Sequence, residues 1–361
     1  MTLDLLDPAR ASSGAHDLMT SDELQTLLHR AVPELAVGLW SMRDARALVT
    51  LPRGSQRFTA CVVTWEDHSR GRTDCAELVV KEDRKRMPRW ADRAARLLVG
   101  AGFGPGSQSQ VAAPYGVCGP GVLVSERAAG LSLLATLRNA PTATAAAVLA
   151  ERAATWLLDL QSVPLALPTS DRRNVGAALP QLVELAAVLG PERAREPGEL
   201  ARRLQAPTGA GQDAVATSHG DLHPANLFLT GDAVVAIDLD TVAAREPAYD
   251  VGYAVTHLVV TSLLAGAPPE HGVAAAARLW DAYRRGGGVA EDHRIAVQAA
   301  RALVQSLHFE LVTFATRRVE LAPLWTGAAL ALLDAGRAGL DVLPELMASF
   351  GEATPVRAVA V

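Results

Sequence analysis

The stretch that decides the fold runs from Ala214 to Tyr253 and reads AVATSHGDLHPANLFLTGDAVVAIDLDTVAAREPAYDVGY. Asp221 precedes Asn226 by five positions, and Asn226 precedes Asp238 by twelve. Between the last two, an apolar run at 234–237 predicts a short strand that ends at Asp238. Phosphoryl transfer from a nucleotide requires one carboxylate at the attacking hydroxyl, and an asparagine with a second carboxylate to hold magnesium on the phosphates. The order of these side chains therefore indicates phosphoryl-transfer chemistry.

Two short motifs in this stretch carry a resemblance to a known family. The sequence H-G-D-L-H-P-A-N at 219–226, followed by I-D-L-D at 237–240, resembles the Brenner-type motif of the aminoglycoside phosphotransferase and choline kinase superfamily. Members of this family have a protein kinase-like fold and act on small molecules. In protein kinases the same positions read H-R-D-x-K-P-x-N and D-F-G. Here Gly220 stands in place of the arginine, His223 in place of the lysine, and Leu239-Asp240 in place of the Phe-Gly pair.

The resemblance implies roles for the polar residues of both motifs. Asp221 would orient the substrate hydroxyl as the catalytic residue, and Asn226 and Asp238 would hold Mg²⁺. Asp240, two positions later, would either share the metal or cap the following turn. The alternative explanation is a set of three polar caps on unrelated turns; the several matching parts at fixed spacing favour the resemblance.

Supporting roles follow for three further residues. His219 is expected to brace the loop through its ring nitrogens rather than to act as a base, and His223 to support the same loop. Asp250, in the sequence P-A-Y-D-V-G, is expected to cap the next helix and to tie it to the catalytic loop, as the family's equivalent does. A zinc site of His219, His223 and Asp221 is the alternative, but no third histidine or cysteine stands at ligand spacing.

Lys81 is the expected phosphate-binding cation. The chain contains only two lysines, Lys81 and Lys85, and Lys81 ends the apolar strand predicted at 78–81. The resemblance implies that Lys81 pairs with the α- and β-phosphates, and a solvated strand end is the alternative. In this family a carboxylate on the following helix, expected at 88–99, steadies the lysine and is usually a glutamate. The candidate here is Asp92, which is one methylene shorter.

Backbone groups of the first part of the chain are expected to make the remaining nucleotide contacts. A turn at Gly54-Ser55 joins strands predicted at 47–51 and 58–65, and the resemblance implies that its N–H groups arch over the phosphates. A plain hairpin is the alternative, because one glycine is a weak signal. Glu126 and Arg127 open a segment that resembles the family's interlobe hinge, whose backbone holds the edge of the adenine.

The order of the predicted elements gives an α+β fold class with a bilobal, protein kinase-like architecture. Residues 1–18 are expected to be a flexible N-terminus. Residues 19–126 are predicted to form a small, β-rich N-lobe that covers the nucleotide and opens with a helix capped by Thr20 and Glu23. Residues 127–361 are predicted to form a larger, mainly helical C-lobe with the catalytic loop and the substrate pocket.

Composition limits the partners and the location. The 361 residues are 49% hydrophobic and 20% charged, as in ordinary globular proteins, and a net charge of −5 offers no large basic surface for nucleic acid. Three widely spaced cysteines without a C-x-x-C pair indicate reduced, packed thiols, and the sequence opens without a secretory signal. The apolar run at 251–267 is too short to span a bilayer and predicts a buried helix. We therefore expect a cytoplasmic protein with neither nucleic acid nor a membrane as partner.

The acceptor is expected to be a small molecule. Only eleven residues separate Asp238 from Asp250, whereas a protein kinase needs a longer activation segment ending in A-P-E to bind a peptide. Acidic residues after position 250 offer sites for an amino-sugar cation, with plain surface charges as the alternative. They are Asp281, Glu291, Asp292, Glu310 and Glu320.

The sequence thus predicts a Mg²⁺-dependent kinase that moves the γ-phosphate of ATP or GTP to a hydroxyl of a small molecule. An aminoglycoside or related antibiotic is the first candidate acceptor, which would make the protein an antibiotic-resistance enzyme. A metabolic kinase for a sugar, an amino alcohol or a biosynthetic intermediate is the alternative. A nucleotide-binding pseudokinase scaffold is the alternative of another class. It is favoured by Asp92 and the weak glycine loop, and opposed by the complete set of Asp221, Asn226 and Asp238.

Overall fold

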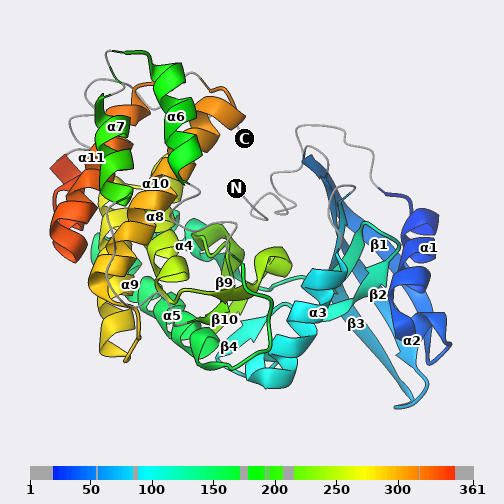
Figure 1. Ribbon diagram of the computed structural model, residues 1–361. Coiled ribbons are helices and arrows are strands. Elements are labelled where there is room, and N and C mark those ends of the chain that lie inside the picture. Colours follow the sequence, from blue (N-terminus) through cyan, green and yellow to red (C-terminus); the bar gives the residue numbers. More distant parts are fainter. Residues whose placement is uncertain are drawn as a thin grey trace. The chain divides into compact units, whose positions relative to one another are not determined.

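The computed structural model describes most of the chain as two compact units. It describes residues 19–53, 56–83, 88–170, 178–191, 193, 195–205, 215–316 and 318–345. The first unit comprises the chain up to Ser132 together with Phe228–Thr241, and the second comprises Leu133–Leu227 and the chain from Val242 onward (Figure 1). The expected flexible segment 1–18 and the expected phosphate turn at Gly54-Ser55 lie outside the described residues.

The first unit is built on an antiparallel sheet of five strands. Their order is β1 (Trp40–Arg53), β2 (Gln56–Asp67), β3 (Arg72–Asp83), β6 (Val122–Glu126) and β5 (Pro114–Cys118). The first three strands are longer than their apolar runs, because the ladder continues through polar residues as far as the pair Trp40 and Asp67. The buried Asp67 carboxylate accepts the N–H groups of Ser69 and Arg70. A tight turn at 68–71 therefore joins β2 to β3.

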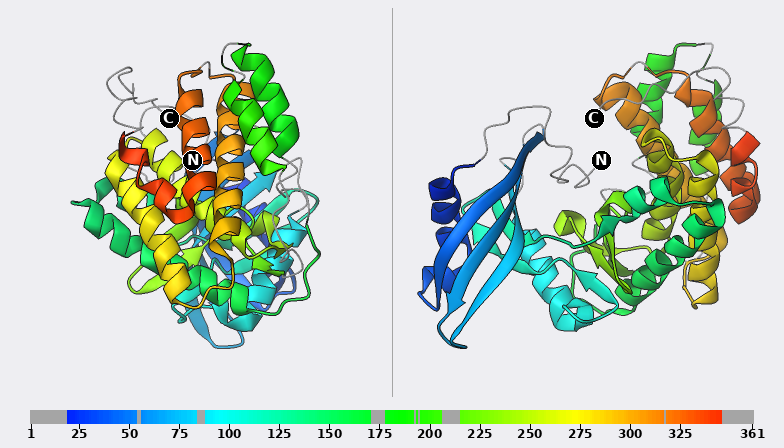
Figure 2. Two further views of the ribbon diagram at one scale, coloured as in Figure 1. Left: turned by 60° about the vertical axis from the view of Figure 1, so that its left-hand side comes forward. Right: turned by 180° about the vertical axis from the view of Figure 1, so that it is seen from behind.

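Two helices, α1 (Ser21–Ala31) and α2 (Pro33–Ala36), pack against this sheet; they are coloured blue in Figure 2. α1 begins with the predicted capping box, in which Thr20 and Glu23 each accept the other's backbone N–H. The core that the helices cover includes Leu24, Leu28, Trp65, Val80 and Val124. Cys61 lies in the same core, and burial raises the pKa of its thiol to about 12, so that the thiol stays protonated.

A second, smaller sheet brings Phe228–Thr241 into the first unit. The predicted boundary after residue 126 assigns this segment to the helical part, but its backbone pairs with strands that precede Leu133. A Cβ atom at Gly130 would lie 2.1 Å from the carbonyl oxygen of Leu229, so glycine is required for this pairing. The strands follow the order β4 (Ser109–Val111), β10 (Ala233–Ala236), β9 (Leu227–Thr230) and β7 (Leu131–Ser132).

The second unit is mainly helical. Its helices are α4 (Leu133–Asn139), α5 (Ala143–Ser162), α6 (Ala178–Leu189), α7 (Arg195–Leu204), α8 (Ala248–Leu264), α9 (Pro269–Arg285), α10 (Asp292–His308) and α11 (Leu321–Ala335). α8 packs against α9 and α10 (Figure 1) and is buried along most of its length, as the apolar run at 251–267 predicts. Two short strands, β8 (Ala216–Ser218) and β11 (Ala243–Arg245), pair beside these helices. Among the described residues, no helix has the length and hydropathy needed to cross a membrane.

The contact between α8 and α10 depends on a glycine. A Cβ atom at Gly252 would lie 2.6 Å from the backbone nitrogen of Ala299 and 2.7 Å from the Cβ of Gln298, both on α10. We expect Gly252→Ala to lower the free energy of unfolding by about 1–3 kcal/mol, because the two helices must move apart. Chemical denaturation of the purified protein measures this change.

The matched control for this substitution is Gly198→Ala on α7. Gly198 is exposed, and a Cβ atom there has no heavy atom within 4 Å among the atoms that the structure describes. Alanine has the higher helix propensity, so we expect a neutral or stabilising change of at most about 1 kcal/mol. Equal losses of stability in the two variants would contradict the close-packing explanation.

Candidate active site

The loop that carries Asp221 is fixed to the start of α8 by a buried carboxylate. Asp250 has no exposed surface, and its oxygens accept the backbone N–H of His219 at 2.7 Å and of Gly220 at 2.9 Å. Gly220 has φ of 81°, a conformation that favours glycine. Asp250 lies inside the first turn of α8, whose N-cap is Pro247, so the expected capping role is wrong. The carboxylate holds the loop, which is the other part of its expected role.

Both the backbone and the side chain of Asp221 are hydrogen-bonded. Its N–H donates to Nδ1 of His219 at 3.2 Å, and its Oδ1 accepts the hydroxyl of Tyr253 at 2.6 Å. The ring of His219 is fully buried and packs against Trp156, with ring centroids 6.0 Å apart and an interplanar angle of 67°. His219 thus braces the loop through a ring nitrogen, and Tyr253 orients the carboxylate.

Asn226 presents a buried oxygen. Its Nδ2 donates to the backbone oxygen of Asp221 at 3.0 Å, and the side chain has no exposed surface. Oδ1 of Asn226 has no hydrogen-bond partner among the residues that the structure describes. A buried acceptor without a partner costs about 1–3 kcal/mol. An amide oxygen is also a suitable ligand for a hard cation, so Asn226 fits the expected role in holding Mg²⁺.

Two aromatic residues of α8 belong to this site, although the sequence analysis did not single them out. Tyr253 packs against His257 with ring centroids 4.2 Å apart, and the ring of His223 lies 6.0 Å from that of His257. Burial, reinforced by His223 and opposed by Asp221, lowers the pKa of His257 to about 3, so this imidazole is neutral at neutral pH. The spacing of Asp250, Tyr253 and His257 places these three side chains on one face of a helix. This spacing is the feature of the sequence from which Tyr253 and His257 could have been predicted as site residues.

The first unit brings two predicted carboxylates together around the predicted lysine, Lys81. Nζ of Lys81, near the end of β3, lies 2.8 Å from Oδ1 of Asp238 and 2.7 Å from Oδ2 of Asp240. Asp240 lies in the 3₁₀ turn η6 (Leu239–Thr241), directly after Asp238. Burial acts to lower the pKa of Lys81, but the two carboxylates together outweigh it and raise this pKa, so the ammonium is fully charged.

The expected pairing of Asp92 with Lys81 is not found. On α3 (Arg89–Leu98), the Asp92 carboxylate accepts both Nε of Arg96 at 2.9 Å and a terminal nitrogen of the same guanidinium at 3.1 Å. The two residues are four positions apart on one helix, a spacing at which a carboxylate and a cation meet. The Asp92 carboxylate is therefore paired with Arg96 on its own helix, and the carboxylates near Lys81 are those of Asp238 and Asp240.

The expected hinge residues use their backbone N–H groups within the first unit. Glu126 donates its N–H to the oxygen of Ala113 at 2.8 Å, and Arg127 donates to the oxygen of Glu77 at 2.9 Å. The side chain of Arg127 also pairs with that of Glu77. In this arrangement these two N–H groups hold strands in place, so an adenine edge would have to meet other backbone groups.

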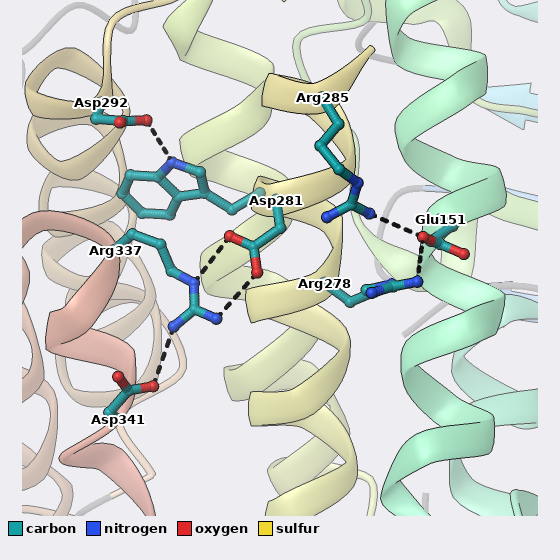
Figure 3. Close-up of polar contacts among 8 residues, drawn as sticks. Glu151, Arg278, Asp281, Arg285, Asp292, Arg337 and Asp341 are labelled. Carbon is teal, nitrogen blue, oxygen red and sulfur yellow. Dashed lines mark hydrogen bonds and ion pairs between the residues drawn. The ribbon is translucent and has the colours of Figure 1, made fainter.

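The acidic residues considered for a substrate cation are mostly engaged in local ion pairs and hydrogen bonds. The Asp281 carboxylate accepts hydrogen bonds from two nitrogens of Arg337 at 3.0 and 3.1 Å. The Asp292 carboxylate accepts a hydrogen bond from the indole nitrogen of Trp280 at 2.8 Å (Figure 3). Oε2 of Glu291 lies 3.1 Å from Nδ1 of His293, and Oε1 of Glu320 lies 4.0 Å from Nε of Arg318. For these four residues the geometry favours local ion pairs and hydrogen bonds over an amino-sugar site. The side chain of Glu310 has no assigned role.

Each unit thus assembles part of the predicted set. The second unit contains Asp221, Asn226, His219, His223 and Asp250, and the first contains Lys81, Asp238 and Asp240. In the described part of the chain, no group of three or more His, Cys, Asp or Glu is arranged to hold a metal ion. The zinc alternative therefore gains no support. A magnesium site needs no such group, because phosphate oxygens and water complete its coordination.

Solved structures show the same fold at low sequence identity. A choline/ethanolamine kinase family protein from Mesorhizobium loti is 15% identical, with a TM-score of 0.51 over 91% of this chain and 98% of its own. A thermostable mutant of the aminoglycoside phosphotransferase APH(4)-Ia is 14% identical, with a TM-score of 0.53 over 80% of this chain and 94% of its own. These likenesses confirm the predicted α+β, protein kinase-like fold. A search of curated protein sequences finds no match.

A sequence model of one protein family matches residues 64–293. The matched part includes Lys81, the loop at 219–226, Asp238 and Asp250, which are the residues that the two units hold in place. Because the match spans more than half of the chain and contains this whole set, the protein belongs to the phosphotransferase enzyme family.

Proposed function

We propose that this phosphotransferase moves the γ-phosphate of ATP or GTP to a hydroxyl of an aminoglycoside or a related antibiotic. The observation that carries the reaction type is the contact between Lys81 and Asp238, whose side chains are 2.8 Å apart in the first unit. Phosphoryl transfer requires a cation on the phosphate oxygens and a carboxylate on the metal that those oxygens bind. Lys81 and Asp238 supply these two groups side by side.

Asn226 and Asp238 are the residues that we propose to hold Mg²⁺ with the nucleotide. Oδ1 of Asn226 is a buried oxygen without a hydrogen-bond partner among the described residues, as a metal ligand would be in the absence of the metal. When bound, Mg²⁺ neutralises charge on the phosphate oxygens and aligns them for attack.

Asp221 is the residue that we propose to hold the acceptor hydroxyl. Its carboxylate is oriented by Tyr253, while its backbone is fixed through His219 and through the Asp250 carboxylate. The transition state of phosphoryl transfer is loose, so little proton removal is needed before attack. Asp221 therefore contributes mainly by orienting the hydroxyl and by taking its proton late.

A small acceptor is favoured by the segment between Asp238 and Asp250. This segment is occupied by the turn η6, the strand β11 and the first residues of α8. Too few residues remain in it for the extended platform on which protein kinases bind a peptide. The class of acceptor rests on the resemblance of the motifs and on the solved structure of an aminoglycoside phosphotransferase with the same fold.

The second candidate acceptor is an amino alcohol or a related metabolite. It is favoured by the choline/ethanolamine kinase family protein, whose structure matches 91% of this chain and 98% of its own. Both candidates use the same phosphate and metal groups, so only the acceptor distinguishes them. A panel of aminoglycosides, other hydroxylated antibiotics, sugars and amino alcohols, with labelled ATP and GTP and Mg²⁺, identifies the acceptor and the nucleotide.

Replacing Asp238 tests the proposed function. We expect Asp238→Asn to lower kcat/KM on the best acceptor by about 10²-fold or more, because a neutral amide is a weaker ligand and leaves Lys81 with one carboxylate. The matched control is Asp232→Asn, in the exposed turn before β10, which we expect to keep full activity. Full activity of Asp238→Asn would refute the metal assignment. Nucleotide binding without turnover on any acceptor would instead favour a pseudokinase.

A further inference from the structure

We propose that Asp240 is the positioning residue of Lys81, in place of a carboxylate on the helix that follows β3. This inference rests on the proposed function, in which Lys81 binds the nucleotide phosphates. Asp240 lies in η6, two positions after Asp238, and its Oδ2 is 2.7 Å from Nζ of Lys81. The helix α3 offers Asp92, but this carboxylate is bound to Arg96 through two hydrogen bonds.

The local backbone explains why Asp238 and Asp240 both reach the lysine. Asp238 has a positive φ of 61°, which turns the chain sharply at the end of the strand β10. Leu239, between them, is buried at 5% exposure, so the two carboxylates lie on the opposite side, toward Lys81. Because α3 packs against η6, this helix supports the turn that carries Asp240 instead of supplying the carboxylate itself.

The two carboxylates differ in what nucleotide binding demands of them. Asp238 is the proposed metal ligand, so its contact with Lys81 competes with Mg²⁺. Asp240 is more buried than Asp238, with 12% against 27% of the side chain exposed. A lysine ammonium has three N–H donors, so Lys81 can stay bound to Asp240 while its other donors turn to phosphate oxygens. Asp240 is therefore the partner that keeps Lys81 in place after Asp238 takes the metal.

A double-mutant cycle on MgATP binding tests this role. The full-length protein is titrated with MgATP by calorimetry in four forms: unchanged, Lys81→Met, Asp240→Asn and the double variant. We expect Asp240→Asn alone to weaken MgATP about 10- to 100-fold, because Lys81 then keeps only Asp238, the carboxylate that the metal needs. In the Lys81→Met background we expect Asp240→Asn to change the affinity by less than about twofold, because its effect requires the lysine.

Two further variants separate positioning from a general structural effect. Asp92→Asn makes the same chemical change on α3, and we expect it to leave MgATP affinity within about twofold of the unchanged protein. Asp240→Glu keeps a carboxylate, and we expect it to bind MgATP more tightly than Asp240→Asn does. Thermal unfolding of each variant shows whether it is folded, and the Asp240→Glu comparison stands even if Asp240→Asn is unstable.

The outcomes distinguish the inference from the proposed function. Equal effects of Asp240→Asn with and without Lys81 would overturn the inference and indicate that Asp240 binds the metal directly. An effect of Asp92→Asn as large as that of Asp240→Asn would overturn it in favour of the helix carboxylate. Unchanged MgATP affinity in Lys81→Met would overturn the nucleotide role of Lys81, and with it both proposals.

Discussion

Asp221→Asn lowers kcat by about 10²–10⁴-fold while MgATP affinity stays within about twofold of the unchanged protein; this is the largest effect that we expect on the reaction. Asparagine has almost the same shape as aspartate, so the hydroxyl of Tyr253, now 2.6 Å from Oδ1, keeps an oxygen to donate to. The amide cannot accept the proton of the acceptor hydroxyl and orients it less strongly. Initial rates with labelled ATP on the best acceptor, together with calorimetric titration of MgATP, measure the two quantities.

Tyr253→Phe is the control that leaves the carboxylate in place. It removes only the hydroxyl that orients Asp221, so we expect a loss in kcat of about tenfold, clearly smaller than that of Asp221→Asn. Comparable losses in the two variants would mean that Tyr253 has a role of its own in the reaction. An Asp221→Asn protein with full kcat would show that the acceptor hydroxyl is activated elsewhere.

Asp250→Ala has the largest expected effect on stability. Its fully buried carboxylate accepts the N–H groups of His219 and Gly220 at 2.7 and 2.9 Å. Loss of the acceptor that both amides use costs about 1–3 kcal/mol for each hydrogen bond, and the truncated side chain leaves a cavity beside the loop. We expect Tm to fall by at least about 5 °C, since each kcal/mol corresponds to about 2–4 °C in a domain of this size. Scanning calorimetry at fixed protein concentration measures the shift.

Activity should fall together with stability in this variant. The same two hydrogen bonds hold the backbone directly before Asp221, so we expect Asp250→Ala to lower kcat even at temperatures where the protein is folded. Asp281→Ala is the control, because Asp281 forms a partly exposed ion pair with Arg337, worth at most about 1 kcal/mol. A Tm for Asp250→Ala as high as that of Asp281→Ala would contradict the stabilising role of the Asp250 carboxylate.

Much of the fold follows from patterns along the chain. The capping box at Thr20 and Glu23 predicts the start of α1, and the long apolar run at 251–267 predicts the buried helix α8. Strand ends are harder to predict, because a β-ladder continues wherever two backbones pair, whatever the polarity of the side chains. β2 thus extends to Asp67, a polar residue whose burial only the turn after it explains.

The place of Phe228–Thr241 in the first unit could not be predicted from the position of these residues in the sequence. These residues follow the Asp221 loop in sequence, but their strands pair with β4 and β7, which lie about one hundred residues earlier. Hydrogen-bond partners of a strand depend on contacts between distant parts of the chain, and no local pattern records them. The same limit concealed Tyr253 and His257, whose relevance appears only once α8 is placed beside the Asp221 loop.

By itself, the sequence determined the chemistry of the protein. Asp221, Asn226 and Asp238 occur at fixed spacing, and a family model that includes them places the chain among the phosphotransferases. Such spacing is a local property, since each group needs only the right side chain at the right turn or strand end. Tertiary structure alone decided which carboxylates meet Lys81. Asp238 and Asp240 approach it although they follow it by 157 and 159 positions in the sequence. The nearer candidate, Asp92, is held by Arg96. Charge attraction acts through space over a few ångströms, so the fold, and not the order of residues, selects the partners.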